Sequence, residues 1–450
     1  MSYSFCFGPS GSGKSQRLRE ILIGKAQASL ACGGNDRTKY ILVVPEQYSM
    51  QTQRELVQDH PARVLMNIDV LSFGRLAYRV FEETGADRRT VLDDIGKSLL
   101  LRRVAAGCEK DLQVLHRGIR RTGMIDEIKS VLSEFMQYGI DEAQIGQMAD
   151  YAGSCGQRAL QARLLDMKVL LRGFREAETD RYITSEQTMD LLAKAIPKAE
   201  SLRGSVVIFD GFTGVSTVQY RVLIELIRCA KEVVFSLTAG FDSGPDMQEV
   251  AAGGLPGDQE ALFYLSRRTV FDIIRLASGE KLKRGKDIYL PGASVLVSPA
   301  VLPRYGQNRA LSHLERHLFR YPLVPFSEKK TGETGSVLRL FAATTPQEEV
   351  RQIFSQIHRM IAQTGCAWRD FAIITADLAA YGDLIEAEAS RYEVPVYIDR
   401  TSAVFHNILI EGIRSVLQIS SENFSYASVF RYLRSGLSRL TLQEDRKSVV

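Results

Sequence analysis

The chain has 450 residues, of which 45% are hydrophobic and 24% are charged, and this composition excludes a disordered or fibrous protein. No uncharged apolar run is long enough to cross a membrane, so we expect no membrane association and a cytoplasmic location. The 57 basic and 53 acidic residues give a net charge of +4, which is too small to indicate a nucleic-acid partner by itself. The six cysteines lack metal-ligand spacing and are interpreted as reduced thiols.

The first part of the chain alternates short apolar runs with helical patterns, which predicts an α/β fold with a parallel sheet covered by helices. Residues 91–197 interrupt this order with apolar side chains at helical spacing, which is typical of an α-helical insertion. We therefore expect a first P-loop (RecA-like) domain at residues 1–90 and 198–330 around that insertion. Five apolar runs are its predicted strands: residues 4–7, 40–44, part of 64–73, 206–209 and 233–235.

A second α/β pattern follows. Thr345-Pro346-Gln347-Glu348 combines an N-cap, a proline at the first helical position and a capping-box glutamate, which predicts a helix start. We expect an incomplete second RecA-like domain at 335–420 and the truncated start of a second insertion at 421–450. On this interpretation the chain is the N-terminal part of a longer protein. Three further apolar runs are predicted strands: residues 337–341, 371–375 and 396–398.

A glycine-rich segment between the first predicted strand and helix matches the phosphate-binding pattern G-x-x-x-x-G-K-[ST]. Its backbone N–H groups would surround the phosphates of ATP, Lys14 would neutralise phosphate oxygens, and the Ser15 hydroxyl would coordinate Mg²⁺. The alternative is a glycine-rich turn that binds nothing. The predicted ATP-binding residues are Gly8, Pro9, Ser10, Gly11, Ser12, Gly13, Lys14 and Ser15.

A P-loop also needs an acidic residue that holds the metal ion. Asp210 follows the apolar run 206–209 and is the candidate, with Ser15, for the Mg²⁺ site; the alternative is a turn residue that caps the next helix. Hydrolytic helicases place a glutamate directly after this aspartate, and Gly211 stands there instead. Because a general base contributes roughly 10²–10⁴-fold to the rate, we predict ATP binding with slow turnover.

Several segments together, in this order and spacing, resemble the AddB-type subunit of the bacterial ATP-dependent helicase–nuclease, which is related to the superfamily 1 helicases. The resemblance extends from residue 1 to about Leu437. Beyond the P-loop, the segments that carry it are Val44-Pro45-Glu46-Gln47-Tyr48-Ser49, Leu71-Ser72-Phe73-Gly74-Arg75-Leu76-Ala77, Phe209-Asp210-Gly211-Phe212-Thr213-Gly214, Asp370-Phe371-Ala372-Ile373-Ile374-Thr375 and Val394-Pro395-Val396-Tyr397-Ile398-Asp399-Arg400.

The resemblance implies a helicase fold that has lost its motor role and pairs with an AddA-type motor subunit. It implies that the heterodimer degrades DNA ends at double-strand breaks for homologous recombination and scans single-stranded DNA for a Chi-like hotspot sequence. The family's nuclease domain and iron–sulfur cluster would belong to the part beyond this chain, so we assign no catalytic residue here. Two rival functions remain: a stand-alone P-loop ATPase or small-molecule kinase, and a structural scaffold with a vestigial P-loop.

The resemblance also implies contacts with single-stranded DNA from residues that follow the strands of the first domain. Open parallel sheets bind ligands outside the carboxyl ends of their strands, and aromatic rings and arginines hold unpaired bases there. The alternative for Phe73 and Tyr78 is packing in the core. The predicted DNA-binding residues are Gln47, Ser49, Phe73, Arg75, Tyr78 and Phe212.

Overall fold

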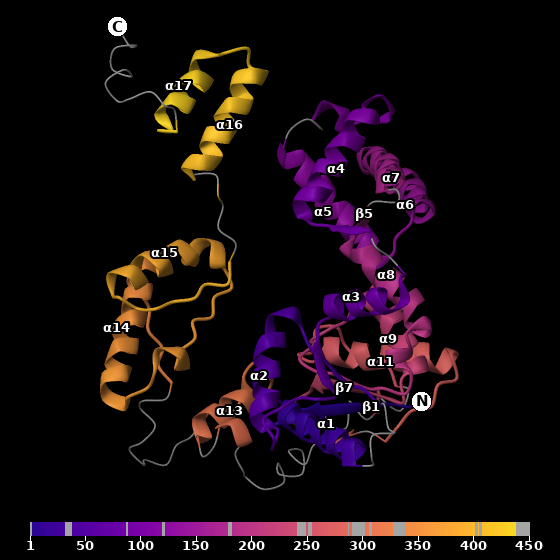
Figure 1. Ribbon diagram of the computed structural model, residues 1–450, viewed down its shortest axis with the longest axis vertical. Helices are drawn as coiled ribbons and strands as arrows, with labels where there is room; N and C mark the ends of the chain where they lie inside the picture. The colour runs from indigo at the N-terminus through magenta and orange to yellow at the C-terminus, as the bar shows by residue number, and fades with distance from the viewer. Residues whose placement is uncertain are drawn as a thin grey trace. The chain divides into compact units, whose positions relative to one another are not determined.

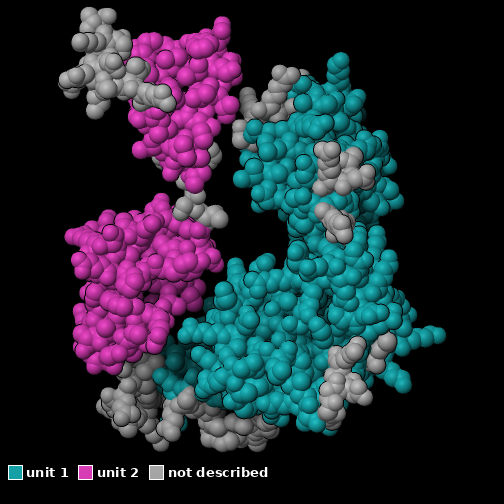
Figure 2. All heavy atoms as spheres, in the orientation of Figure 1, with its two compact units in different colours: residues 1–338 teal, residues 339–450 magenta. Residues whose placement is uncertain are grey.

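The structure is a computed structural model that divides into two compact units, residues 1–338 and 339–450, coloured separately in Figure 2. Within the described part, no helix combines the length and the apolar character needed to cross a membrane. The described residues are 2–31, 38–86, 89–118, 122–178, 182–240, 249–250, 254–286, 288–289, 302–305, 308–326, 338–400, 404 and 407–437.

The first unit is built on a parallel sheet of six strands in the order β3-β2-β6-β7-β1-β8. Every printed pairing is parallel, so the carboxyl ends of the strands lie at one edge. This arrangement confirms the predicted α/β fold. The strands are β1 (Ser2–Gly8), β2 (Tyr40–Val43), β3 (Ile68–Leu71), β6 (Val206–Phe209), β7 (Glu232–Thr238) and β8 (Ile288–Tyr289).

Helices cover both faces of this sheet, which explains why its strands are apolar on both sides. Along β1, Phe5 and Phe7 face one core, and Cys6 faces the other. The first core is closed by α3 (Phe73–Thr84), α8 (Ser185–Ala195), α9 (Thr217–Cys229) and α11 (Tyr264–Gly279). The second is closed by α1 (Lys14–Ala31) and α2 (Ser49–Asp59), and Figure 1 shows α1 beside β1.

The helical insertion has a core of its own, and Figure 1 shows its helices gathered in one bundle beyond α8. The short parallel strands β4 (Thr90–Leu92) and β5 (Tyr182–Thr184) pair where the chain leaves and re-enters the sheet domain. We predicted neither strand, and the prediction also assigned α8 to the insertion, whereas its apolar side chains pack in the core of the sheet domain. The bundle consists of α4 (Asp94–Gly107), α5 (Thr122–Tyr138), α6 (Glu142–Ser154) and α7 (Arg158–Glu178).

The second unit begins with the capped helix that the sequence predicts. The Thr345 side chain accepts a hydrogen bond from the backbone N–H of Glu348 at 3.2 Å, and Pro346 opens the helix. A small core joins Val350 and Phe354 to α15. The helices of the unit are α14 (Pro346–Thr364), α15 (Leu378–Arg391), α16 (Ile408–Ser421) and α17 (Tyr426–Arg434).

The strands predicted for this unit are not formed in the described residues. Residues 338–341, 371–375 and 396–398 have no assigned secondary structure, and Val337 lies outside the described residues. Ile374 is 94% exposed and Tyr397 is 88% exposed. Because a strand needs hydrogen-bonded neighbours, an apolar extended run does not become a strand where no partner pairs with it.

Candidate nucleotide site and sheet edge

The glycine-rich segment connects β1 to α1 at the carboxyl edge of the sheet. Gly11 and Gly13 have φ values of +74° and +85°, a conformation that glycine adopts without steric cost. The backbone N–H of Ser12 donates to the carbonyl of Pro9 at 3.3 Å and closes the turn. Helix α1 then begins at Lys14, so the positive end of its dipole points at the loop.

Lys14 lies inside the loop rather than in solvent. Its Nζ donates to the carbonyl oxygens of Gly8 at 2.8 Å and of Pro9 at 2.9 Å. Burial lowers the pKa of Lys14, and nearby groups that include Asp210 and Glu315 act in the opposite direction. The lysine is therefore a partly desolvated cation at the centre of the loop, where its charge acts more strongly than in water.

Asp210 is a buried carboxylate directly after β6, at the same edge of the sheet. Its backbone N–H donates to the carbonyl of Val43 at 3.0 Å, which fixes the start of the following loop. Beside it on β1, the thiol of Cys6 is buried, and burial raises its pKa to about 12. Cys6 is thus a neutral neighbour of the lysine and the aspartate.

Position 211 is a glycine for a backbone reason. Gly211 has a φ of +80°, and a Cβ placed there would lie 3.4 Å from Cδ of Pro45. A glutamate at this position would combine a strained backbone with a tight contact. The loop that follows Asp210 is therefore not shaped to hold the carboxylate that hydrolytic helicases carry there.

These residues fit Mg²⁺-ATP. The Ser12 hydroxyl is buried without a hydrogen-bond partner, and a phosphate oxygen would provide one. Ser15 is exposed at the first turn of α1, where its hydroxyl could reach a metal ion bound to the phosphates. Lys14 would bind the phosphates, and Asp210 would hold the metal ion from the opposite strand end.

The predicted DNA-binding residues fall into two groups. Gln47 in η1 (Glu46–Tyr48) and Arg75 in α3 are exposed, and Tyr78 in α3 is 71% exposed. A polar contact links these two elements, because the Ser72 hydroxyl donates to a carboxylate oxygen of Glu46 at 3.5 Å. The exposed group therefore extends over the ends of the neighbouring strands β2 and β3.

The other three predicted residues are packed within the fold. Phe73 is 8% exposed, and its ring centroid lies 5.7 Å from that of Phe209 and 5.4 Å from that of Phe212. Phe212 is partly buried against the same core. Ser49 is buried, and its hydroxyl donates to the carbonyl of Glu46 at 2.9 Å. This is the placement that the core-packing alternative expects for Phe73.

Two residues near the site were not among the predictions. Tyr48 is half-exposed between Gln47 and Ser49, and its neighbours in the sequence are the signal that could have indicated it. Glu315 in α13 (Arg309–His317) lies against the P-loop although about 300 residues separate them in the chain. No local pattern could have indicated Glu315, because only the tertiary structure brings it to the loop.

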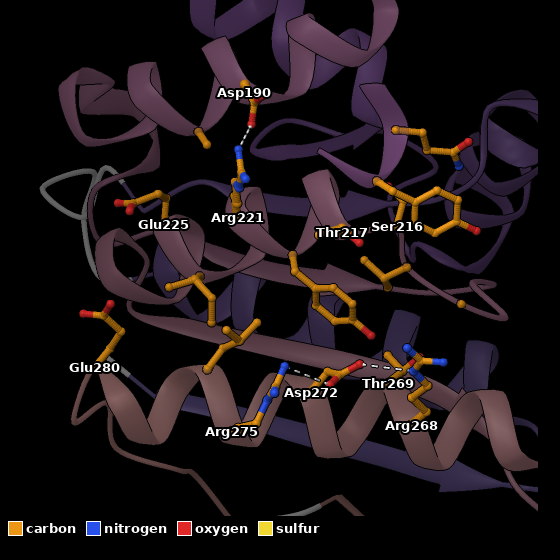
Figure 3. Close-up of a pocket in the computed structure, with 18 of the residues that line it drawn as sticks. Asp190, Ser216, Thr217, Arg221, Glu225, Arg268, Thr269, Asp272, Arg275 and Glu280 are labelled. Carbon is orange, nitrogen blue, oxygen red and sulfur yellow. Dashed lines mark hydrogen bonds and ion pairs between the residues drawn. The ribbon is translucent and has the colours of Figure 1, made fainter. Parts of the chain in front are cut away.

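A separate cavity of about 1100 Å³ lies between α8, α9 and α11, and its charges compensate one another (Figure 3). Arg221 pairs with Asp190 at 2.7 Å, and Arg268 and Arg275 both approach Asp272, at 3.6 and 3.5 Å. An anionic ligand would have to break these ion pairs. The P-loop, with backbone N–H donors and a buried lysine, is the better anion site despite its smaller enclosure.

A family model described as "ADDB, N-terminal" matches residues 5–315, which include the P-loop, the insertion and α13. The chain belongs to the AddB family. Three AddB relatives are each named as the B-type component of an ATP-dependent helicase/deoxyribonuclease. The protein of Lachnoclostridium phytofermentans is 32% identical over 99% of this chain and 36% of its own length. The protein of Desulforudis audaxviator is 32% identical over 97% and 35%, and that of Acetivibrio thermocellus is 27% identical over 100% and 36%.

The AddB resemblance read from the sequence motifs is therefore confirmed. The chain spans about a third of the length of these AddB relatives. The family match begins within β1 and ends within α13, so the P-loop, Asp210 and the exposed strand-end residues all lie in the part of AddB that the family model covers.

Proposed function

We propose that this chain is the nucleotide-binding, helicase-like part of an AddB protein, that it binds ATP with Mg²⁺, and that it hydrolyses ATP slowly or not at all. The observation that carries the proposal is the P-loop itself. Two left-handed glycines, the helix N-terminus and the buried Lys14 converge on one anion site. Slow turnover is supported by Gly211, whose backbone conformation disfavours a catalytic glutamate.

We further propose that the complete protein works in a heterodimer with an AddA-type motor and nuclease subunit in the cytoplasm. The names of the relatives support an ATP-dependent helicase/deoxyribonuclease with more than one subunit. In this proposal the heterodimer processes DNA double-strand breaks for homologous recombination, and AddB scans the emerging single strand for a Chi-like sequence. The iron–sulfur cluster and the nuclease domain of AddB would lie outside this chain.

Within that role, Gln47, Arg75 and Tyr78 are the proposed contacts with single-stranded DNA. Their exposure at the ends of β2 and β3 supports base stacking by the tyrosine and hydrogen bonds from the arginine and the amide. Phe73, Phe212 and Ser49 would support this surface from below, because their side chains are occupied in packing or in backbone hydrogen bonds.

Equilibrium titration with labelled Mg²⁺-ATP tests the nucleotide proposal. We expect the wild type to bind and Lys14→Ala to lose affinity by about tenfold or more, since a charge-assisted contact with phosphate is worth about 1.5–3 kcal/mol. Lys110→Ala is the matched control, because Lys110 is an exposed lysine of the insertion. Equal affinities of the wild type and Lys14→Ala would favour a scaffold with a vestigial P-loop. Rapid hydrolysis or phosphoryl transfer without DNA would favour a stand-alone ATPase or kinase.

The DNA proposal is tested in the complete heterodimer. Arg75→Ala and Gln47→Ala should abolish the response to the recognition sequence and leave unwinding of DNA ends intact, because the partner supplies the motor. Arg158→Ala removes an exposed arginine of the insertion and serves as the control. Loss of unwinding together with recognition would mean that Arg75 and Gln47 support the fold instead.

A further inference from the structure

A distant segment of the chain covers the P-loop. The backbone N–H of Arg304, in η7 (Pro303–Tyr305), donates to the carbonyl of Gly11 at 3.2 Å. A Cβ on Gly11 would lie 3.0 Å from Cβ of Arg304 and 3.2 Å from the ring of Tyr305. Gly11 is thus required both by its left-handed φ and by this close approach.

The same segment brings a carboxylate onto the loop. Glu315, in α13, accepts a hydrogen bond from the backbone N–H of Ser10 and lies within Coulombic range of Lys14. Its second oxygen, Oε2, is buried and has no hydrogen-bond partner. Burial raises the pKa of Glu315, while Arg320, the Ser10 N–H, Lys14 and Arg316 act in the opposite direction.

The groups that Glu315 engages are the groups that a P-loop offers to phosphate. A backbone N–H of the loop and the loop lysine both serve an anion, and in this structure the anion is a carboxylate of the protein itself. A triphosphate placed on the loop would bring several negative charges close to that carboxylate. In a partly buried site, like charges at such separations repel strongly.

We propose that Glu315 is an internal gate on the nucleotide site: its carboxylate occupies P-loop donors when no nucleotide is bound and must be displaced or neutralised when a nucleoside triphosphate binds. This inference rests on the proposed binding of ATP at the P-loop. It also assigns a purpose to the cover formed by η7 and α13, which holds the carboxylate against the loop. The nucleotide affinity of the protein is then set by this competition as well as by the P-loop.

A different role for the same carboxylate makes the opposite prediction. Because Gly211 stands where a catalytic glutamate is expected, Glu315 could instead activate water for hydrolysis. In that case its loss would lower the turnover rate and leave the affinity for ATP unchanged. A gate does the reverse: its loss raises affinity, because nothing competes with the phosphates.

The experiment is titration of Glu315→Gln with labelled Mg²⁺-ATP. The substitution keeps the shape of the side chain and removes its charge, and we expect ATP to bind about tenfold more tightly than to the wild type. Glu315→Ala should shift affinity in the same direction. Glu200→Gln, an exposed carboxylate of η6 (Glu200–Leu202), should bind as the wild type does. Thermal unfolding of each variant verifies that it is folded.

The outcomes separate the gate from the proposal on which it rests. If the wild type binds ATP through Lys14 but Glu315→Gln binds no more tightly, the gate is wrong and nucleotide binding stands. Slower hydrolysis by Glu315→Gln at unchanged affinity would also overturn the gate. If neither the wild type nor Glu315→Gln binds ATP, nucleotide binding itself is wrong, and the gate is overturned with it.

Discussion

The helical insertion and the carboxyl edge of the sheet both contain a buried aspartate, and they use it differently. In the insertion, Asp166 of α7 accepts hydrogen bonds from the backbone N–H groups of Gln113, Val114 and Leu115 at 2.7, 2.8 and 2.9 Å. At the sheet edge, Asp210 places its charge beside Lys14. The insertion therefore uses its buried carboxylate to hold the fold together, whereas the sheet edge keeps one next to a candidate ligand site.

The aromatic side chains of α3 give this comparison its largest expected effect. Phe73→Ala removes a ring packed against Phe209 and Phe212, so it should lower the free energy of unfolding by about 3–5 kcal/mol. Tyr78→Ala removes an exposed ring from the same helix and should change stability by no more than about 0.5 kcal/mol. Urea denaturation measures both. Similar losses for the two variants would mean that the edge is not divided into a packed and an exposed part.

The two aspartates give the next largest effect. Asp166→Ala leaves three backbone N–H groups without their acceptor, and we expect a loss of about 3 kcal/mol in the free energy of unfolding. Asp210→Asn should cost about 1 kcal/mol or less, yet weaken the binding of Mg²⁺-ATP. Denaturation and nucleotide titration on both variants test the difference. If Asp210→Asn were the more destabilising change, the aspartate at the edge would also be structural.

The sequence predicts the sheet of the first unit well, and physics explains where it fails elsewhere. The runs that became β1, β2, β6 and β7 are buried on both faces, so a continuous apolar run is a sufficient signal. The runs around Ile374 and Tyr397 are equally apolar but have exposed side chains and no ladder. Apolar character indicates a strand only when neighbouring strands complete the pairing.

The candidate site divides in a similar way. The P-loop could be predicted because its chemistry depends on adjacent residues, and the chain order alone places it between a strand and a helix. The separation of Phe73 from Tyr78 could not, because it depends on which face of α3 meets Phe209. Glu315 could not either, since its contact with Ser10 arises only when the chain is folded.

Two cysteines complete the comparison through their chemistry rather than through stability. Cys6 is buried at the sheet edge, and Cys155 is exposed at the end of α6 in the insertion. Because the pKa of Cys6 is raised from 9.0 to about 12, its thiolate fraction at neutral pH falls by about 10³-fold. We therefore expect a maleimide to label Cys155 readily and to leave Cys6 unmodified in the native protein, as peptide mass spectrometry would show.

The raised pKa of Cys6 also predicts how stability depends on pH. Above about pH 9 the thiol ionises in the unfolded chain but stays protonated in the folded one, so the unfolded state binds fewer protons and stability falls as the pH rises. Cys6→Ser should keep a buried polar group but reduce this slope, while Cys155→Ser should leave it unchanged. Denaturation between pH 7.5 and about 10 measures the slopes, with the ordinary cysteine range as reference. Rapid labelling of native Cys6, or equal slopes in the wild type and Cys6→Ser, would mean that the P-loop side of the sheet opens to solvent as readily as the insertion's surface.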